Sequence, residues 1–475
     1  MTIRDRIVAE RKDRIAREGP ELGATVPADR QVAAASFSAG PLVICEIKKR
    51  SPSRGVIDGD LDVVAQAGRY ASAGIRHVSV LTEPNHFDGS LDDLMRIKQN
   101  YPELAVLRKD FLLDEQDVEI SYRAGADAVL LIAGMIDRER LSSMLQTAER
   151  LGMAAIVEVH DSSDVEEVRA LRPSLVGINA RDLTTFKTDL MHPLRLRPTI
   201  DWPAQLVFES GIFFAEQAAP ALAAGFDGIL VGEGVVRRPD LAKDLLTIFH
   251  GKAAPDFWGK LYARMTCRIQ VGVEKALPRP FVKVCGLTCR EDALRAVEAG
   301  ADLLGFVLTD SPRRAAPEMI ARLGDIGSLK VGVTVNDASV AAALQRDGHL
   351  DVVQLHGTEP AERCADLVQP YFKAIRIKNR ADAELIDAYR CPRVLVDAPS
   401  SGRRVADKLI DAAAEHRPLW LAGGISPDNV VTVINRHAPE LLDVSSGLEI
   451  FPGKKDPEKL RAFFQAVEVA CRAAA

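Results

Sequence analysis

The chain has 475 residues, of which 47% are hydrophobic and 27% are charged, and its formal net charge is −6. A chain of this length is too long for one ordinary hydrophobic core, so we expect two or more domains. The composition is that of a globular protein and excludes a disordered or fibrous chain. The charge is mild and Lys and Arg are scattered, which argues against a nucleic-acid-binding protein.

The N-terminal residues 1–19 mix charged residues with a few apolar ones at helical spacing and have no apolar centre like that of a signal peptide. No later run approaches the ~18 apolar residues of a membrane span. Seven irregularly spaced cysteines are unlike a disulfide framework, and the close pair Cys285 and Cys289 lacks the second pair of a zinc site. We therefore expect a cytoplasmic protein with reduced thiols, no membrane partner and no metal.

Four segments share one pattern, in which a helix ends at Ala-Gly and a short apolar strand follows. They are residues 71–82, 122–133, 222–234 and 297–308. Glycine at a helix end takes the left-handed conformation that stops the helix. Helices that alternate with strands apolar on both faces indicate βα units around a parallel sheet.

Such strands occur in two groups of eight. Before residue 240 they are 42–47, 77–82, 105–110, 128–133, 154–159, 175–180, 205–210 and 228–233. After residue 280 they are 281–286, 303–308, 330–335, 352–357, 372–377, 393–398, 419–424 and 441–446. Eight βα units in 200 to 250 residues, found twice, predict an α/β fold of two fused (β/α)8 TIM barrels.

The alternative is a doubly wound open sheet, but neither half has the G-x-G-x-x-G fingerprint after its first strand. Between the two groups lies a stretch richer in aromatic and basic residues, which ends in two prolines before a new strand. We expect a first domain over 1–255, a linker over 256–280 and a second domain over 281–475.

Polar residues end the strands of the first barrel, where TIM barrels carry their chemistry. One such residue is typical of a solvated loop, whereas a set on one rim indicates a pocket. Glu46 and Lys48 are two residues apart, so their side chains point to the same side of the first strand. The candidates are Glu46, Lys48, Lys109, Glu158, Asn179, Glu209 and Ser210.

Glycines follow the last two strands of the first barrel, in ESGI at 209–212 and VGEG at 231–234. They leave backbone N–H groups unobstructed, and the loops after strands seven and eight are the usual phosphate site of this fold. A simple tight turn is the alternative. The position favours a phosphate.

The strand ends of the second barrel carry a thiol and a carboxylate, Cys285 and Asp397, on opposite sides of the rim. A cysteine is most often a core residue, but at a strand end facing a carboxylate the two can serve as base and acid. An ordinary thiol pKa near ~8.5 would need only a modest downward shift, to which Arg313 can contribute. His356 ends the fourth strand, where a structural histidine is the alternative.

The motifs resemble two enzyme families. The first half contains ICEIKKRSPSRG, LRKDF, VEVH, GINARDLTTFKTDL and FESGI, which resemble indole-3-glycerol phosphate synthase through most of residues 1–255. The second half contains VKVCGLT, GFVLTDSPRR, VGVTVND, VQLHG, LAGGISPDNV and DVSSGLEIFPGKKDPEKL, which resemble phosphoribosylanthranilate isomerase over 281–475. The whole chain is similar to the bifunctional tryptophan-biosynthesis proteins of bacteria.

For the second barrel, the resemblance implies an Amadori rearrangement of N-(5-phosphoribosyl)anthranilate to 1-(2-carboxyphenylamino)-1-deoxyribulose 5-phosphate. Asp397 would be the acid that opens the furanose ring, and Cys285 the base that removes the C2′ proton. The positions that match anthranilate- or phosphate-binding residues are Arg313, His356, Gly424, Asp443, Ser445 and Ser446.

For the first barrel, the resemblance implies ring closure of that product to indole-3-glycerol phosphate, with loss of carbon dioxide and water. Lys109 matches the general acid and Glu158 its partner in the dehydration, while Lys48 and Arg181 match groups near the anthranilate carboxylate. The remaining matched positions are Glu46, Asn179, Glu209, Ser51, Ser210, Gly211 and Gly232. Both reactions imply small phosphosugar anthranilate substrates and no cofactor or metal.

Two positions depart from the families' patterns. Gly234 stands where a phosphate-binding hydroxyl is expected, although a backbone N–H can replace it. The loop at 398–404, APSSGRR, replaces a mobile loop rich in glycine pairs.

Two rival functions fit parts of this pattern. A Schiff-base aldolase also presents a lysine at a strand end, which would give Lys109 the role of nucleophile. A scaffold that only binds a metabolite would need no complete set of strand-end groups.

Overall fold

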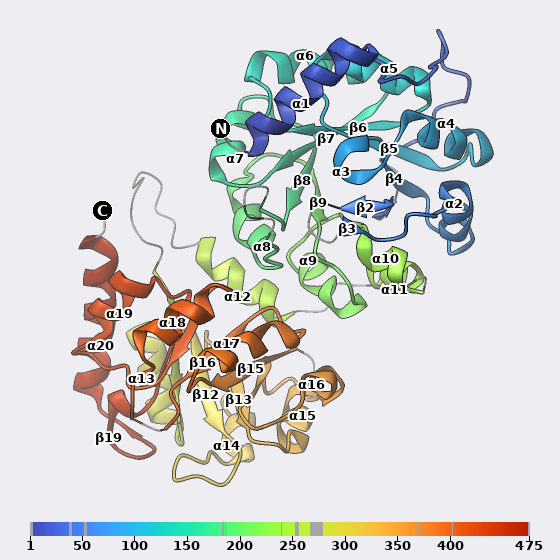
Figure 1. Ribbon diagram of the computed structural model, residues 1–475. Coiled ribbons are helices and arrows are strands. Elements are labelled where there is room, and N and C mark those ends of the chain that lie inside the picture. The colour runs from blue at the N-terminus through green and yellow to red at the C-terminus, as the bar shows by residue number, and fades with distance from the viewer. Residues whose placement is uncertain are drawn as a thin grey trace. The chain divides into compact units, whose positions relative to one another are not determined.

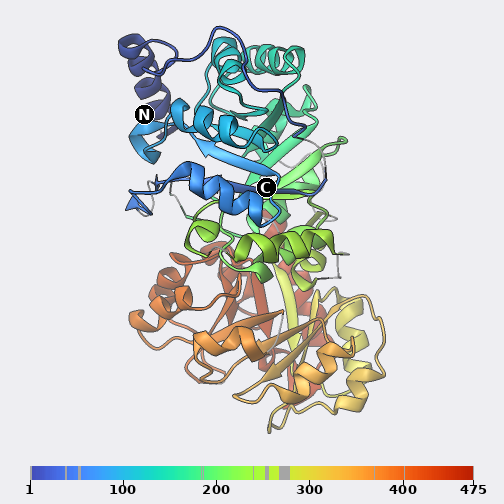
Figure 2. The same cartoon turned by 90° about the vertical axis from the view of Figure 1, so that its right-hand side faces the viewer.

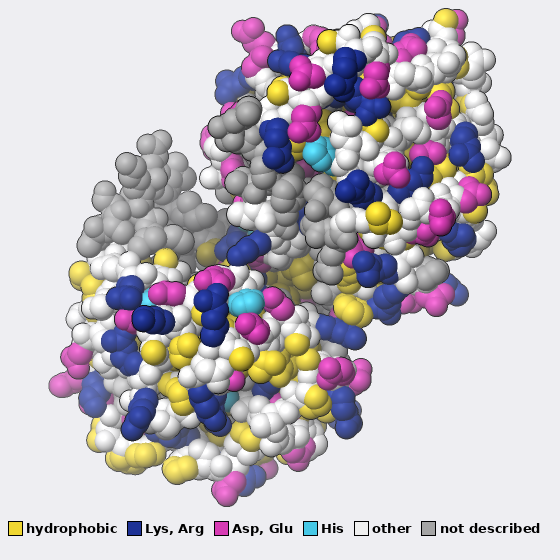
Figure 3. Space-filling model, viewed as in Figure 1, with side chains coloured by type: hydrophobic (Ala, Val, Ile, Leu, Met, Phe, Trp, Pro, Cys, Tyr) yellow, Lys and Arg dark blue, Asp and Glu magenta, His cyan; other side chains and the backbone are white. Residues whose placement is uncertain are grey.

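The computed structural model describes residues 3–473, without 38–39, 52–54, 183–184, 186, 239, 252–255, 267–278, 368–369 and 401. The chain divides into two compact units, Met1–Thr266 and Cys267–Ala475. Within each unit, helices surround a closed set of strands (Figures 1 and 2). Figure 3 shows basic and acidic side chains mixed on the visible face of both units.

The first unit is a closed barrel of eight parallel strands, in the order β1-β10-β9-β8-β7-β6-β5-β4. The strands are β1 (Leu42–Ile47), β4 (His77–Leu81), β5 (Ala105–Lys109), β6 (Ala128–Ile132), β7 (Ala154–Val159), β8 (Leu175–Asn179), β9 (Gln205–Glu209) and β10 (Gly228–Val231). All eight predicted strands are confirmed. A short hairpin, β2 (Arg50–Ser51) with β3 (Gly55–Val56), follows β1.

The helices of the first unit connect successive strands, and a few are additions to the barrel. They are α1 (Ile3–Glu18), α2 (Val63–Ser72), α3 (Pro84–Phe87), α4 (Leu91–Asn100), α5 (Glu115–Ala124), α6 (Arg138–Arg150), α7 (Ser162–Arg169), α8 (His192–Leu196), α9 (Ala219–Ala223), α10 (Glu233–Arg237), α11 (Leu241–His250) and α12 (Phe257–Thr266).

The second unit is also a closed barrel of eight parallel strands, here in simple sequence order. The strands are β11 (Phe281–Cys285), β12 (Leu303–Val307), β13 (Leu329–Thr334), β14 (Val352–Leu355), β15 (Tyr371–Arg376), β16 (Val394–Asp397), β17 (Trp420–Ala422) and β18 (Leu441–Val444). The fold class predicted from the sequence is therefore confirmed for both halves.

Eight helices cover this second barrel, and a hairpin follows its last strand. The helices are α13 (Arg290–Ala299), α14 (Pro317–Ala321), α15 (Ser339–Arg346), α16 (Ala361–Leu367), α17 (Arg380–Glu384), α18 (Asp407–Ala414), α19 (Val430–His437) and α20 (Pro457–Ala473). The hairpin pairs β19 (Glu449–Phe451) with β20 (Lys454–Lys455).

The glycines of the repeated Ala-Gly pattern end helices as predicted. Gly125 and Gly300 cap α5 and α13 with φ values of 100° and 103°. A side chain is strained in this left-handed region, and glycine is not.

Side chains alternate along each strand between the barrel interior and the surrounding helices. On β1, Leu42 and Ile44 belong to the apolar interior, and Glu46 continues the same period toward the C-terminal end. On β5, Leu107 is followed in the same way by Lys109. The catalytic candidates of the first barrel are thus the last inward-facing layer above an apolar interior.

The first unit extends to Thr266, beyond the predicted domain end at 255. Helix α12 packs against α8 and α9, and its residues Phe257, Trp258 and Leu261 are buried. This amphipathic helix therefore occupies the first part of the range 256–280 that we expected to be a linker.

Helix α1 is held on the first barrel by a buried ion cluster. Arg11, 5% exposed, lies 3.2 Å from a carboxylate oxygen of Asp110 and 2.8 Å from one of Asp117. Burial alone would raise the pKa of Asp110, but Arg11 and Arg108 outweigh it and lower that pKa to about 2. The cluster joins α1 to the strand end next to Lys109.

We expect Arg11→Met to lower the free energy of unfolding of the first barrel by about 3–5 kcal/mol, because it leaves buried carboxylates without one of their cations. Arg14→Met on the same helix is the control, since its more exposed pair with Glu18 is expected to contribute about 0–1 kcal/mol. Urea unfolding of both variants measures the difference. Equal stabilities would contradict a structural role for the cluster.

Candidate active sites

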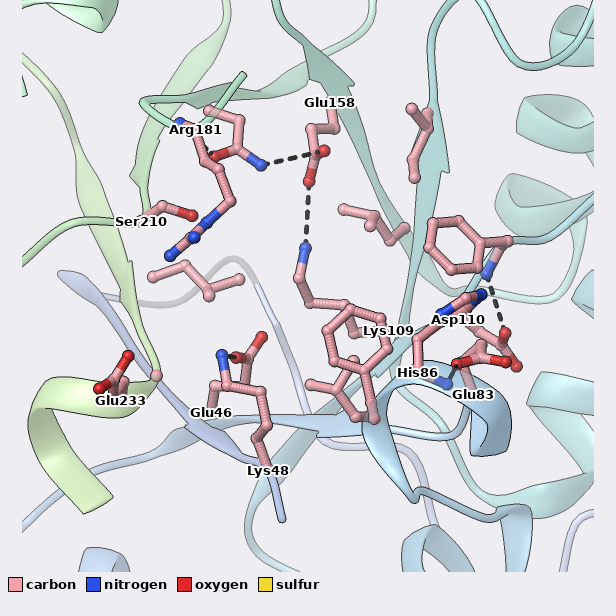
Figure 4. A pocket seen from close by; sticks show the side chains of 18 of the residues that line it. Glu46, Lys48, Glu83, His86, Lys109, Asp110, Glu158, Arg181, Ser210 and Glu233 are labelled. Atoms are coloured by element: carbon pink, nitrogen blue, oxygen red, sulfur yellow. Dashed lines mark hydrogen bonds and ion pairs between the residues drawn. The ribbon is translucent and has the colours of Figure 1, made fainter. Parts of the chain in front are cut away.

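The strand ends of the first barrel surround a cavity of about 340 Å³, which we call the first cavity (Figure 4). It brings together residues that the sequence separates by almost 200 positions. The predicted residues that line it are Glu46, Lys48, Lys109, Glu158, Asn179, Arg181, Ser210, Gly211 and Gly232. The backbone of Ser51 lies in β2, and its side chain is outside the described residues.

Lys109 stands between two carboxylates. Its Nζ lies 3.0 Å from Oε2 of Glu158 and 3.2 Å from Oε2 of Glu209. Nδ2 of Asn179 donates to the other oxygen of Glu158 at 3.2 Å. Beside this group, Nζ of Lys48 lies 2.5 Å from Oε1 of Glu46, as their predicted common orientation requires.

These contacts determine the protonation of the lysine. Burial alone would lower the pKa of Lys109, but the carboxylates of Glu158, Glu209 and Glu46 outweigh it and raise that pKa above its ordinary value. Lys109 is therefore an ammonium group and a proton donor. A Schiff-base nucleophile needs a neutral amine, so the cluster argues against the aldolase alternative.

The two carboxyl groups beside Lys109 differ from each other. Burial raises the pKa of Glu209, and Glu158 adds to this effect although Lys109 opposes it. For Glu158, burial is outweighed by Lys109 and by His160, which lower its pKa. One carboxyl group thus tends to keep a proton and its neighbour to release it, which is the usual arrangement of an acid and a base.

His160, which is not among the residues predicted from the sequence, lies two residues after Glu158, just beyond β7. Its Nε2 is 3.0 Å from Oε1 of Glu158, and its Nδ1 is 3.4 Å from Oδ2 of Asp164. Burial alone would lower the pKa of His160, but these two carboxylates raise it to about 9. Its positive charge at neutral pH helps to keep Glu158 ionised. His160 is the last residue of the VEVH motif, whose second residue is Glu158, so its position two residues after Glu158 could have identified it.

The remaining walls of the first cavity come from segments that strand-end reasoning does not reach. Arg6 and Ile7 of α1 line it, as do His86 and Phe87 of α3. Nε2 of His86 lies 2.8 Å from a carboxylate oxygen of Glu10, which connects α3 to α1. These helices add an apolar and basic wall beside the reacting groups.

The loop after β9 has a backbone suited to an anion. Ser210 has φ 72° and Gly211 has φ 84°, so two successive residues lie in the left-handed region. After the adjacent strand β10, Gly232 precedes α10, and a β-carbon there would lie 2.4 Å from Oε1 of Glu46. A side chain at Gly232 would therefore crowd Glu46, whereas a β-carbon at Gly211 would lie 2.7 Å from the side chain of Thr188.

The strand ends of the second barrel line a cavity of about 510 Å³, the second cavity. All eight predicted residues of this barrel border it: Cys285, Arg313, His356, Asp397, Gly424, Asp443, Ser445 and Ser446. Pro399, Ser400 and Gly402 of the unusual loop at 398–404 also line it. The loop is therefore part of the cavity wall despite its different sequence.

Asp397 accepts a hydrogen bond at each carboxylate oxygen. The backbone N–H of Ala398 lies 2.8 Å from Oδ1, and Nε2 of His356 lies 3.1 Å from Oδ2. Asp397 and Cys285 border the same cavity from β16 and β11, on opposite sides of the barrel. A molecule in the cavity can contact both.

The thiol differs from our expectation. Burial raises the pKa of Cys285 above its ordinary value, and Asp443 raises it further, although Lys283 opposes them. Arg313, which we expected to contribute to a downward shift, has its Nη2 and Nε paired with Glu449 at 2.7 and 2.9 Å. Lys283, on the thiol's own strand, is the buried cation that opposes the rise in the Cys285 pKa most, and the buried Lys455 acts in the same direction. We did not select Lys283 from the sequence because it precedes the strand end.

Among the described residues, no three His, Cys, Asp or Glu side chains are grouped as metal ligands. None of the described helices is long and apolar enough to cross a membrane. The six cysteines that the structure describes are free, with Cys285 buried and Cys289 partly exposed.

Comparison with known proteins matches both halves. The family model of indole-3-glycerol phosphate synthase matches residues 5–248, and that of N-(5′-phosphoribosyl)anthranilate isomerase matches residues 282–466. A crystal structure of phosphoribosyl anthranilate isomerase from Thermus thermophilus is 37% identical, with a TM-score of 0.37, over 40% of this chain and 98% of that chain.

Similar proteins include some that contain both halves. The tryptophan biosynthesis protein TRP1 of Phytophthora nicotianae is 32% identical over 85% of this chain and 87% of its own length. The TrpCF protein of Vibrio parahaemolyticus is 31% identical over 93% of this chain and 88% of its own. The multifunctional protein of Schizosaccharomyces pombe is also 31% identical, but the match spans only 59% of its length. The chain therefore belongs to the family of bifunctional tryptophan-biosynthesis enzymes that join an N-terminal indole-3-glycerol phosphate synthase to a C-terminal phosphoribosylanthranilate isomerase.

Proposed function

We propose that Lys109 and Glu158 carry the proton transfers of the synthase reaction, and Cys285 and Asp397 those of the isomerase reaction. The observation that carries this proposal is the position of these groups: each cavity has a proton donor and a proton acceptor in the last inward-facing layer of its barrel. The product of the C-terminal barrel is the substrate of the N-terminal one. Both reactions consist of proton transfers and C–C or C–O bond changes that such groups can promote.

In the C-terminal barrel, the substrate is N-(5-phosphoribosyl)anthranilate. Asp397 protonates the furanose oxygen, so that the C1′–O bond breaks and an iminium forms. Cys285 then takes the proton from C2′, and the resulting enol-amine becomes the ketone. The acid acts on the ring oxygen bound to C1′ and the base on the neighbouring C2′, which fits the position of both groups at the border of one cavity.

In the N-terminal barrel, the anthranilate ring carbon that bears the carboxylate attacks the carbonyl carbon C2′. The ammonium of Lys109 protonates the oxygen of that carbonyl group at the same time. Carbon dioxide leaves from that ring carbon, and the hydroxyl group leaves as water. Glu158 exchanges protons in the dehydration. Lys48 and Arg181 bind the carboxylate that departs, while Glu46, Asn179 and Glu209 hold the reacting groups in place.

The loops after β9 and β10 bind the substrate phosphate through Ser210 and through backbone N–H groups near Gly211 and Gly232. Gly234 fits this arrangement, because a β-carbon at this position would lie 2.4 Å from the carbonyl oxygen of Ile212. A serine hydroxyl therefore has no room here without movement of the loop that follows Ser210.

We expect Gly234→Ser to weaken binding of the synthase substrate by about 5- to 150-fold, the equivalent of the 1–3 kcal/mol typical of overpacking. The weaker binding should raise the KM of the synthase step and leave the kinetics of the isomerase step unchanged. Steady-state kinetics with each substrate measure this. Tighter binding by the serine variant would mean that the hydroxyl can be accommodated.

The role of Cys285 is tested by alkylation. Iodoacetamide should abolish isomerase activity, a bound substrate analogue should protect it, and synthase activity should survive, because the thiol borders only the second cavity. Cys289 is the more exposed thiol nearby, so Cys289→Ala should keep both activities and the same sensitivity. Loss of isomerase activity in Cys289→Ala alone would move the role to that residue.

The free thiols fit a reducing compartment, and we propose the cytoplasm as the site of both reactions.

A further inference from the structure

A buried polar layer lies below the strand ends of the second barrel. Lys283 of β11, Gln354 of β14 and Asp443 of β18 form it, and they are 0%, 1% and 8% exposed. Nζ of Lys283 donates to Oε1 of Gln354 and to Oδ2 of Asp443, both at 2.7 Å. A charge buried this deeply is stable only with such partners.

The Lys283 ammonium also interacts with Cys285. The two residues are two positions apart on β11, so both side chains point into the barrel, and each influences the ionisation of the other. Gly305, on the adjacent strand, shows how close they are. A β-carbon there would lie 2.7 Å from Sγ of Cys285 and 3.0 Å from Cε of Lys283. Two N–H groups of the ammonium thus serve Gln354 and Asp443, and the thiol lies beside this group.

The same ammonium determines the orientation of Gln354. An ammonium can only donate, so the amide oxygen of Gln354 faces it and the amide NH₂ faces Nδ1 of His356, at 3.1 Å. Nδ1 must then accept, and the ring proton of neutral His356 is on Nε2, from which it is donated to Asp397. A continuous hydrogen-bonded chain joins Lys283 to Asp397.

This chain affects the proton of Asp397. His356 already has its proton on Nε2, and Gln354 opposes a second proton on Nδ1. His356 therefore does not take the acid proton from Asp397, which remains available to a molecule in the second cavity. On the other side of the barrel, Lys283 opposes the effect of burial on Cys285.

We propose that Lys283 and Gln354 are positioning residues of the isomerase reaction: Lys283 stabilises the Cys285 thiolate and, through Gln354, fixes the His356 tautomer that leaves the Asp397 proton to the substrate. This inference rests on the roles proposed above for Cys285 and Asp397. Neither Lys283 nor Gln354 needs to touch the substrate.

Other charged groups near the thiol are already paired. Lys455 of β20 lies 3.0 Å from Oε1 of Glu449, and Arg313 is bound by the same carboxylate at 2.7 Å. Asp443 is paired with Lys283 and leaves its Oδ1 without a partner among the described residues. Lys283 is thus the cation whose removal should change the thiol most.

The first experiment compares Lys283→Met with Lys373→Met in the full-length chain. Lys373 is the matched control, a lysine 2% exposed on β15 whose Nζ pairs with Glu359 at 3.0 Å, and it is not among the residues lining the second cavity. The rate of iodoacetamide reaction at Cys285, followed by mass spectrometry of its peptide, is measured against pH. The pH dependence of isomerase kcat/KM is measured in parallel.

In Lys283→Met, the alkylation profile should move to higher pH by about one unit or more, and isomerase kcat/KM at pH 7 should fall about tenfold or more and recover at higher pH. Lys373→Met should keep the wild-type profile. An unchanged alkylation profile in folded Lys283→Met overturns the proposal. A shifted alkylation profile with unchanged isomerase kinetics would instead show that Lys283 stabilises the thiolate but that Cys285 is not the base of the reaction.

Gln354→Glu tests the proposed effect of Gln354 on the His356 tautomer. This test does not depend on whether Lys283→Met folds. The carboxylate of Gln354→Glu still accepts from Lys283 but offers no donor to His356, so a proton should move to Nδ1. The ¹⁵N chemical shifts of His356 should change accordingly, and isomerase kcat should fall about tenfold, while KM and the alkylation profile stay nearly constant. Wild-type histidine shifts in this variant would overturn the proposed chain.

Discussion

Lys109→Ala is expected to accumulate 1-(2-carboxyphenylamino)-1-deoxyribulose 5-phosphate when it is given N-(5-phosphoribosyl)anthranilate. The substitution removes the ammonium that stands between Glu158 and Glu209. Loss of such a proton donor typically costs about 10²- to 10⁴-fold in rate, or roughly 3 to 5 kcal/mol of barrier. The acid and the base that we propose for the isomerase step, Asp397 and Cys285, lie in the other barrel, so the rate of that step should barely change.

The accumulated intermediate can be followed by chromatography beside the indole-3-glycerol phosphate that forms. Lys243→Ala, which removes an exposed lysine of α11, is the control and should behave like the wild type. Equal circular dichroism and melting curves would show that Lys109→Ala is folded. A folded Lys109→Ala variant that had lost both steps would mean that the two barrels share one active site, which contradicts the proposal.

The strands and most of the residues that line the two cavities could be predicted from the sequence because both follow local rules. A strand apolar on both faces reads as a continuous run, and the last inward-facing residue of that run borders the cavity. Glu46, Lys109 and Cys285 all satisfy this rule. The glycines that end helices could be predicted by an equally local rule, because each depends only on the left-handed backbone conformation of a single residue.

Partners across the barrel could not be predicted in this way. Lys283 looks like an interruption of an apolar strand until the fold brings Gln354 and Asp443, 71 and 160 residues later, to within 2.7 Å of its Nζ. Arg11 likewise has the appearance of a surface charge on an exposed helix until Asp110 and Asp117 reach it from about 100 residues away. Such contacts depend on barrel closure, which a local pattern does not contain.

The downward shift that we expected for the Cys285 thiol failed for the same reason. At this strand end the Cys285 side chain is only 9% exposed, and burial dominates its pKa. The cation that opposes burial, Lys283, belongs to the layer below. A search restricted to the ends of the strands does not include that layer. The ionisation of the Cys285 thiol therefore depends on two layers of the barrel.

Asp397→Asn should leave N-(5-phosphoribosyl)anthranilate almost unconverted and still turn over supplied 1-(2-carboxyphenylamino)-1-deoxyribulose 5-phosphate at a near-normal rate. The amide has no acid proton for the furanose oxygen, so isomerase kcat should fall by about 10²- to 10⁴-fold. It also has only one oxygen, whereas the carboxylate accepts from both His356 and the backbone N–H of Ala398. One of these two donors must then face the amide NH₂, which adds a local cost without reaching the first barrel.

The two variants together separate the reactions in opposite directions. Lys109→Ala stops the sequence after the first step, and Asp397→Asn stops it before that step, so a mixture of the two purified proteins should restore indole-3-glycerol phosphate formation. The intermediate would have to leave one molecule and enter another, and the restored rate should therefore rise with the concentration of Lys109→Ala until release of the intermediate no longer limits it. If Asp397→Asn kept its isomerase rate while correctly folded, the acid would be another group. His356, which lies 3.1 Å from that carboxylate, would then be the first to test.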